Sequence, residues 1–258
     1  MSLLESIAVV LAGLAAGTIN TVVGSGTLIT FPTLLAFGVP PVTANVSNTV
    51  GLVPGSVAGA FGYRSELEGQ RGRVLRLLSA SVLGGIVGAL LLLVLSPGAF
   101  EAIVPVLILL GVVLVIVQPR LAARVQARAA ARATETGVEK EGDHGWVWPA
   151  VFGTGVYGGY FGAAQGVLLM GVLGIGVDQS LQRSNAVKNI LAGAVNGVAG
   201  VIFIVIADVD WQIVALVGGG AVVGGLLGAR IGKRLPPLAL RTVIVVVGLV
   251  AIASMLLG

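Results

Sequence analysis

Long apolar stretches separated by short polar segments dominate the hydropathy pattern of the chain. The clearest are residues 74–95, 103–117, 211–229 and 238–257, which are near the roughly 20 residues that a membrane-spanning helix needs. Strands of a membrane barrel would alternate apolar and polar residues, and these stretches do not. We therefore predict an all-α protein that crosses the membrane several times.

Part of this pattern occurs twice along the chain. The tetrapeptide at residues 47–50 (SNTV) recurs at 184–187 (SNAV), and the hexapeptide at 84–89 (GGIVGA) recurs at 224–229 (GGLLGA). The spacings of 137 and 140 residues nearly agree, so two halves of one architecture are predicted to lie end to end. The predicted parts are a first transmembrane repeat (1–118), a basic linker (119–146) and a second transmembrane repeat (147–258).

The basic residues lie mainly between the apolar stretches. Of the 15 Lys and Arg residues, 13 fall in residues 64–76, 120–140 and 230–241, and the positive-inside rule places these segments, linker included, in the cytoplasm. The loop before the first Gly-Gly helix is then cytoplasmic, whereas its counterpart at residues 208–210 carries only acids and should face outward. We predict that the repeats have inverted topology, with the N-terminus and the C-terminus outside.

Each predicted repeat begins with a glycine-rich interruption, at residues 17–27 and at residues 157–166. A short apolar stretch follows each, and about 12 helical residues rise only about 18 Å, too little to span comfortably. Each repeat is therefore predicted to contain a glycine-broken pair of short helices followed by three longer helices. Whether the pairs re-enter or span twice stays open. Paired interruptions at corresponding positions indicate the substrate site of a transporter.

Neutral hydrogen-bond donors are concentrated around these breaks. Helices beginning at Gly26 and Gly166 would direct free N–H groups and positive dipole ends at a cavity. Burying a charged lysine in the bilayer costs free energy, so Lys188 should face a cavity or a partner such as Asp178. The alternative is that its side chain snorkels to the membrane surface. Arg183 is either a site residue or a cytoplasmic anchor. The predicted substrate-binding residues are Asn20, Gly24, Ser25, Gly26, Thr27, Ser47, Asn48, Tyr160, Gln165, Gly166, Arg183, Ser184, Asn185 and Lys188.

Composition removes several other classes of function. Hydrophobic residues make up 56% of the chain and charged residues 10%, against about 25% charged in soluble domains. There is no cysteine and one histidine, His144, so we expect no catalytic residues, metal site or cofactor. The turn at residues 24–26 lacks the third glycine of a nucleotide-binding loop, which disfavours an intramembrane enzyme. A small anion and the lipid bilayer are the expected partners, not nucleic acid, and homo-oligomerisation stays open.

The position of the carboxylates bears on the direction of transport. No Asp or Glu lies inside a predicted span, whereas proton relays in membranes usually use buried acids. A monovalent anion that leaves a negative-inside cell gains about 2.3 kcal/mol per 100 mV, so export needs no separate coupling residue. Export is favoured on this ground. Import driven by a cation gradient and a role as an accessory membrane subunit are the alternatives.

The first break also resembles a known family, the TauE/SafE (sulfite exporter or toluenesulfonate-uptake permease) family of bacterial membrane proteins. Residues 24–32 (GSGTLITFP) look like its glycine-rich break followed by a proline, and residues 38–41 (GVPP) and 44–48 also fit. The second copy departs, because residues 162–166 lack the full glycine run and Met170 replaces the proline. The resemblance implies a bacterial inner-membrane transporter of sulfite, sulfoacetate or other organosulfonates.

Overall fold

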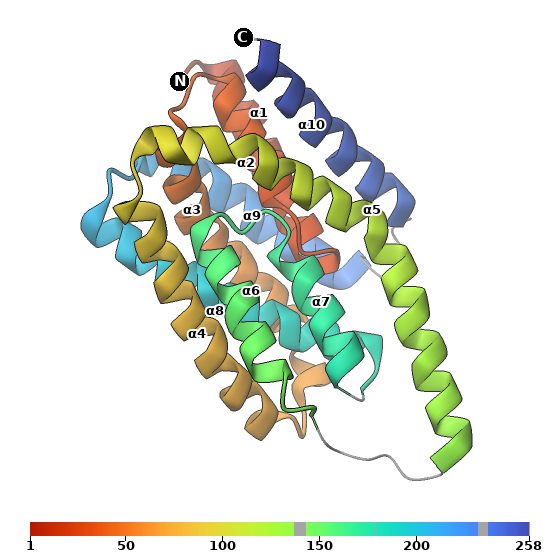
Figure 1. Ribbon diagram of the computed structural model, residues 1–258. Coiled ribbons are helices and arrows are strands. Elements are labelled where there is room, and N and C mark those ends of the chain that lie inside the picture. The colour runs from red at the N-terminus through yellow and green to blue at the C-terminus, as the bar shows by residue number, and fades with distance from the viewer. Residues whose placement is uncertain (137–142, 178, 232–236, 258) are drawn as a thin grey trace.

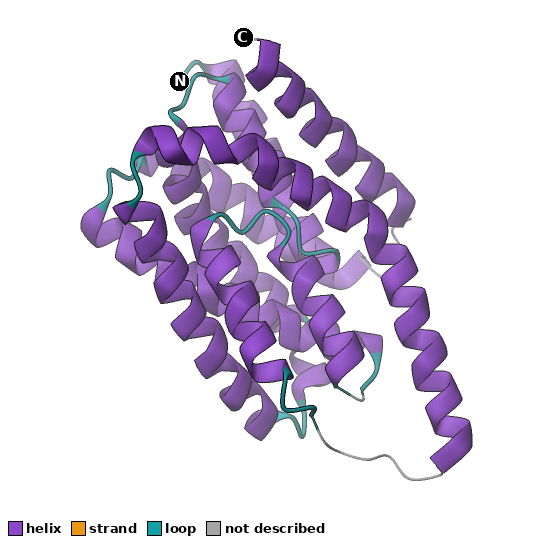
Figure 2. Ribbon diagram, viewed as in Figure 1, coloured by secondary structure: helices purple, strands orange, loops and turns teal. Residues whose placement is uncertain are grey.

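The computed structural model describes residues 1–136, 143–177, 179–231 and 237–257, and these residues form helices and connecting loops without strands. The first half contains α1 (Leu3–Val22), α2 (Thr27–Ala36), α3 (Pro41–Gly62), a short 3-10 helix (Arg64–Leu67), α4 (Arg71–Val94) and α5 (Pro97–Thr136). The second contains α6 (Val147–Tyr160), α7 (Gln165–Gly176), α8 (Leu181–Ile206), α9 (Trp211–Ile231) and α10 (Pro237–Leu257). The predicted all-α class is confirmed (Figure 2).

Five of the described helices are long and apolar enough to cross a membrane: α1, α4, the Pro97–Arg120 part of α5, α8 and α9. With 10 and 12 residues, α2 and α7 are short, as predicted. α1 differs from the expectation of a short helix because it has 20 residues. Its start is fixed by a capping box between Ser2 and Glu5, which satisfies backbone N–H groups at the helix N-terminus.

In each half a short second helix, α2 or α7, is followed by three longer helices, whereas the first helices differ in length, with 20 residues in α1 and 14 in α6. In Figure 1 both termini lie at one end of the molecule, α1 runs from that end toward the middle, and α6 runs toward the middle from the opposite end. This arrangement is consistent with two inverted repeats, which stay a prediction. The first part of the predicted linker continues α5 as a helix to Thr136.

The two halves of the sequence interleave in space. α9 packs against α1 and α3, and α4 packs against α6 and α8. Glycines permit the close approach, because a Cβ atom at Gly17 would clash with Ala221 and one at Gly88 would clash with Val156. Small residues at such contacts let helices pack closely in lipid, where close packing and not the hydrophobic effect drives helix association. The repeated glycine motifs therefore lie at the contacts between the halves.

An aromatic cluster fixes α2 against the second half. The ring of Phe31 in α2 packs edge-to-face on Phe161, with 5.1 Å between centroids, and Phe100 of α5 contacts both rings. Phe161 directly follows the last residue of α6. The middle of α2 is thereby held beside the end of α6, close to where the site forms.

Candidate substrate site

Two helices end in the same way at the centre of the molecule. In α1, the carbonyl of Ile19 accepts the N–H groups of Val23 and Gly24 at 2.7 and 2.9 Å. In α6, the carbonyl of Tyr157 accepts the N–H groups of Phe161 and Gly162, four and five residues further on, both at 3.0 Å. Gly24 and Gly162 have φ angles of 93° and 73°, a left-handed conformation that glycine adopts without strain. These two turns are the predicted breaks.

The two breaks touch each other. The N–H of Gly166, in the first turn of α7, donates to the carbonyl of Gly24 at 3.0 Å. A Cβ atom on either glycine would clash with the backbone of the other. Figure 2 shows the two connecting loops meeting between the helices. The backbone of the second half is thus bonded directly to the break of the first.

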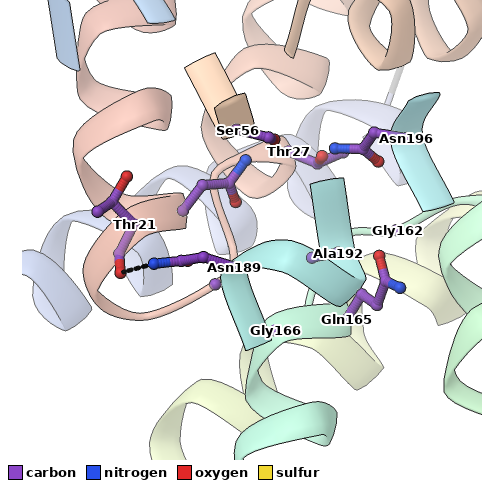
Figure 3. A pocket seen from close by; sticks show the side chains of 11 residues that line it. Thr21, Thr27, Ser56, Gly162, Gln165, Gly166, Asn189, Ala192 and Asn196 are labelled. Carbon is purple, nitrogen blue, oxygen red and sulfur yellow. Dashed lines mark hydrogen bonds between the residues drawn. The ribbon is translucent and has the colours of Figure 1, made fainter. Parts of the chain in front are cut away.

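A polar cavity lies beside this contact (Figure 3). Its empty volume is about 420 Å³, part of it open to solvent. The lining side chains that carry polar groups are amides and hydroxyls, and none of the described lining residues is charged. The lining residues are Asn20, Thr21, Gly24, Thr27, Ser56, Gly162, Gln165, Gly166, Asn189, Ala192 and Asn196.

Lys188 lies next to the cavity, at the C-terminal end of α1. Its side chain is buried, and Nζ donates to the carbonyls of Asn20 at 2.9 Å and Thr21 at 3.2 Å. The side-chain amides of Asn185 and Asn189 also donate to the Thr21 carbonyl, at 3.1 and 3.4 Å. A cation at this position offsets the partial negative charge of the helix end. The partner of Lys188 is thus the broken helix itself.

The end of α6 is held by a different group. The side-chain amide of Asn45, from α3, donates to the carbonyl of Tyr160 at 3.0 Å. One turn further along α3, the amide of Asn48 donates to Oγ1 of Thr27 at 3.3 Å. Helix α3 of the first half therefore caps the broken helix of the second, and α8 caps that of the first.

The predicted site residues divide into three groups. Five of them line the cavity: Asn20, Gly24, Thr27, Gln165 and Gly166. Six others lie at the two breaks or cap them without lining the cavity: Ser25, Gly26, Asn48, Tyr160, Asn185 and Lys188. The remaining three bond elsewhere: Ser47 accepts from the Asp210 N–H, Ser184 from Gln179, and Arg183 donates to the Glu68 carbonyl. Asp178, a considered partner of Lys188, lies outside the described residues.

Several residues of the site were not predicted from the sequence. Thr21, Ser56, Asn189 and Asn196 line the cavity, and Asn45 caps α6. A signal for three amides was present, because Asn185, Asn189 and Asn196 are spaced by four and seven residues. That spacing places them on one face of α8, in an otherwise apolar span. A polar stripe at the helical period would have pointed to a cavity.

An all-helical membrane protein whose interrupted helices surround a polar cavity belongs, by its architecture, with the membrane transporters. The chain is a member of the TauE/SafE family, since the family described as "Sulfite exporter TauE/SafE" matches residues 9–255. It is 28% identical over 235 residues to the probable membrane transporter protein ORF9 of Sinorhizobium sp., with 86% of this chain and 80% of that protein covered. The probable membrane transporter protein YfcA of Escherichia coli (strain K12) is 25% identical over 223 residues, covering 85% and 76%. No solved structure matches the chain.

Proposed function

We propose that this transporter moves a small sulfur-containing anion, such as sulfite, sulfoacetate or another organosulfonate, by alternating access between its two repeats. The observation that carries the proposal is the chemistry of the cavity. Its lining offers amide and hydroxyl donors, no described lining residue is a carboxylate, and a buried lysine lies directly behind Asn20 and Thr21. Such surroundings favour a negative charge over a positive or neutral one.

The backbone adds to this preference. α2 and α7 both begin at the breaks, and neither has a side-chain hydrogen bond at its N-cap. The N-terminal end of a helix carries a partial positive charge and N–H groups that bind anions. Thr27 and Gln165, the first residues of these helices, line the cavity. An anion there would be stabilised by two helix ends and by Lys188 without a full ion pair.

Sulfonate and sulfite oxygens suit these donors. Each oxygen accepts hydrogen bonds from neutral groups, and the amides of Gln165, Asn189 and Asn196 supply several N–H donors around one cavity. A site built from neutral donors also releases its cargo more readily than one built from several arginines. The family description and the relatives' names support transport, and the sulfur class of the substrate follows from the family resemblance.

We propose export as the direction. The membrane potential drives a monovalent anion outward by about 2.3 kcal/mol per 100 mV. No Asp or Glu in the described residues lines the cavity, so a carboxylate proton relay does not reach it. Cation-driven import of organosulfonates or other small organic anions is the alternative, and an accessory membrane subunit is a further one. We place the chain in a bacterial inner membrane, with both termini outside.

The test measures the binding of a panel of anions to the purified protein in detergent, detected as a change in the Tm of thermal unfolding. The panel contains sulfite, sulfate, thiosulfate, sulfoacetate and acetate as choline salts, and the zwitterion taurine in choline chloride, all at equal ionic strength. At 100 times its Kd, a bound anion stabilises the folded state by about 2.7 kcal/mol, which raises the Tm by several degrees. We expect this for at least one sulfur anion, and we expect Lys188→Ala to lose it.

A matched control removes a positive charge away from the site. Arg64 is exposed and stacks on Phe61, so Arg64→Ala should respond to the same anion as the wild type. A wild-type protein that ignores every sulfur anion contradicts the proposed substrate. A folded Lys188→Ala variant with an unchanged response contradicts the role of Lys188 in the site, as does equal loss in both variants.

A further inference from the structure

Four buried side chains beside α2 carry oxygens without a hydrogen-bond partner in the described part of the chain. They are Oγ of Ser25, Oγ1 of Thr30, and the amide oxygens of Asn45 and Asn48. Each of these residues is at most 1% exposed. A buried acceptor left unpaired typically costs about 1–3 kcal/mol, so four in one region of a fold indicate a ligand that supplies the missing interaction.

Three of these residues lie on two helices that meet near the end of α6. Asn45 and Asn48 are three residues apart on α3, and Thr27 and Thr30 are three residues apart on α2, so each pair shares one helix face. The Asn48 amide reaches Thr27 at 3.3 Å, and the Asn45 amide reaches the Tyr160 carbonyl at 3.0 Å. α2 and α3 follow one another and pack together. Thr30, Asn45 and Asn48 therefore lie around the junction of α2, α3 and the end of α6, and Ser25 lies two residues before the first residue of α2.

The corresponding place in the other half holds a cation. The end of α1 is met by Nζ of Lys188, and the repeated tetrapeptides at 47–50 and 184–187 align Lys188 with Gly51. Gly51 has no side chain that could donate to the end of α6. Within the described residues, the hydrogen bond given to the Tyr160 carbonyl comes from the neutral amide of Asn45. Within the part of the chain that the structure describes, the partial negative end of α6 is therefore met by a neutral amide and by no positive charge.

We infer that a monovalent cation, Na⁺, binds at this junction, among the Tyr160 carbonyl and the unpaired oxygens of Ser25, Thr30, Asn45 and Asn48. Hard cations take oxygen ligands, and divalent ions are usually bound by carboxylates. The proposed ligands are all neutral, which suits a single positive charge. The C-terminal ends of interrupted helices are places where transporters coordinate Na⁺. At α6 the ion takes the electrostatic role that Lys188 has at α1.

Such an ion bears on the direction of transport, and only this consequence rests on the proposed function. Na⁺ moving inward with a monovalent anion makes the transported unit electrically neutral, which removes the penalty that the membrane potential places on anion import. A confirmed Na⁺ site would therefore replace the proposed export by the cation-driven import that stands as its alternative. Binding of Na⁺ itself is independent of the substrate and is tested without any sulfur anion.

The first experiment compares the Tm of the purified wild-type protein in NaCl, KCl and choline chloride at constant total salt. We expect a saturable rise in Tm with Na⁺ that K⁺ does not reproduce. Two variants, Ser25→Ala and Thr30→Val, each remove one unpaired hydroxyl and no hydrogen bond of the structure. They are expected to fold, and their apparent Na⁺ affinity should fall at least tenfold.

Ser81→Ala is the matched control. Ser81 lies in α4, is fully buried, and also has a hydroxyl without a partner among the described residues, yet it belongs to neither α2 nor α3. This variant should keep the wild-type Na⁺ response. Equal Tm values in NaCl, KCl and choline chloride for the wild type would overturn the inference. So would a Na⁺ response that Ser25→Ala and Thr30→Val retain in full, because the ion would then bind elsewhere.

The anion panel separates failure of this site from failure of the proposed function. Stabilisation by a sulfur anion in choline buffer, without any Na⁺ response, overturns the cation site and leaves the proposed substrate class intact. A Na⁺ response without stabilisation by any sulfur anion overturns the proposed substrate class and leaves the cation site intact.

Discussion

The ends of α1 and α6 share one backbone geometry and differ in what satisfies it. Both helices stop at a glycine with positive φ, at Gly24 and Gly162, and both ends are capped by a helix of the opposite half. The Thr21 carbonyl accepts from Lys188, Asn185 and Asn189, whereas the Tyr160 carbonyl accepts from one side chain among the described residues, Asn45. The shared backbone geometry thus fixes where the two helix ends lie, and the side chains that cap each end decide the charge around it.

This difference makes the charge distribution at the centre of the molecule asymmetric, which the backbone fold alone would not do. A lysine buried behind the cavity sets a positive potential on one side, at the end of α1. On the other side, the end of α6 is capped by the neutral side-chain amide of Asn45. An inverted pair of identical breaks would treat any ion equally from both halves. Two unlike breaks permit one ion to be held by donors and another by acceptors.

The contact between the breaks is where a substitution should have the largest effect. In Gly166→Ala, the new methyl group would clash with the backbone of Gly24, and backbone cannot rotate aside as a side chain can. We expect a loss of about 3 kcal/mol or more, since overpacking costs about 1–3 kcal/mol even where side chains can move. Thermal unfolding in detergent and the yield of monodisperse protein measure this loss.

Gly197→Ala serves as the control for that substitution. Gly197 lies in α8, and a Cβ atom built there meets nothing within 4 Å. Alanine favours a helix over glycine by about 1 kcal/mol, so this variant should be as stable as the wild type or slightly more so. Equal stability of Gly166→Ala and Gly197→Ala would show that the two breaks do not pack as closely as the structure has them.

A smaller effect distinguishes the two helix ends by their capping. Asn45→Ala removes the amide donor to the Tyr160 carbonyl and should destabilise the protein by about 1–3 kcal/mol. Asn185→Ala removes one of three donors to the Thr21 carbonyl and should cost less than about 1 kcal/mol. Unfolding is measured in choline buffer, so that no Na⁺ contributes. A larger loss in Asn185→Ala than in Asn45→Ala would reverse the comparison.

Most of the fold could be read from the sequence, because membrane helices are set by local composition. Apolar stretches, glycine spacing and the short segments after each break predicted the helices that the structure shows. The length of α1 was missed, since the capping box at Ser2 and Glu5 is a local feature outside the repeat pattern. The interleaving of α4 and α9 between the halves depends on which helix faces which, and no local pattern contains that information.

The site was only partly predictable, for a related reason. Residues at the breaks, such as Asn20 and Gln165, line the cavity because an interrupted backbone needs nearby polar groups. The repeated Ser47 and Ser184 instead bond to other helix junctions, since a repeated motif marks repeated architecture and need not mark a ligand. Asn189 and Asn196 come from α8, far along the chain from either break, and only the packing of the helices brings them in.

The predicted inverted relation between the two breaks has a test that should leave stability and transport unchanged. The chain contains no cysteine, so one cysteine appended after Gly258 is a unique label. A membrane-impermeant maleimide should reach it in intact cells, because the predicted C-terminus is outside. Gly145→Cys, at an exposed position close to α6, lies in the predicted cytoplasmic linker and should react only after permeabilisation. If the appended cysteine also requires permeabilisation, the halves are not inverted as the charge pattern predicts, and the two helix ends would not approach the cavity from opposite sides of the membrane.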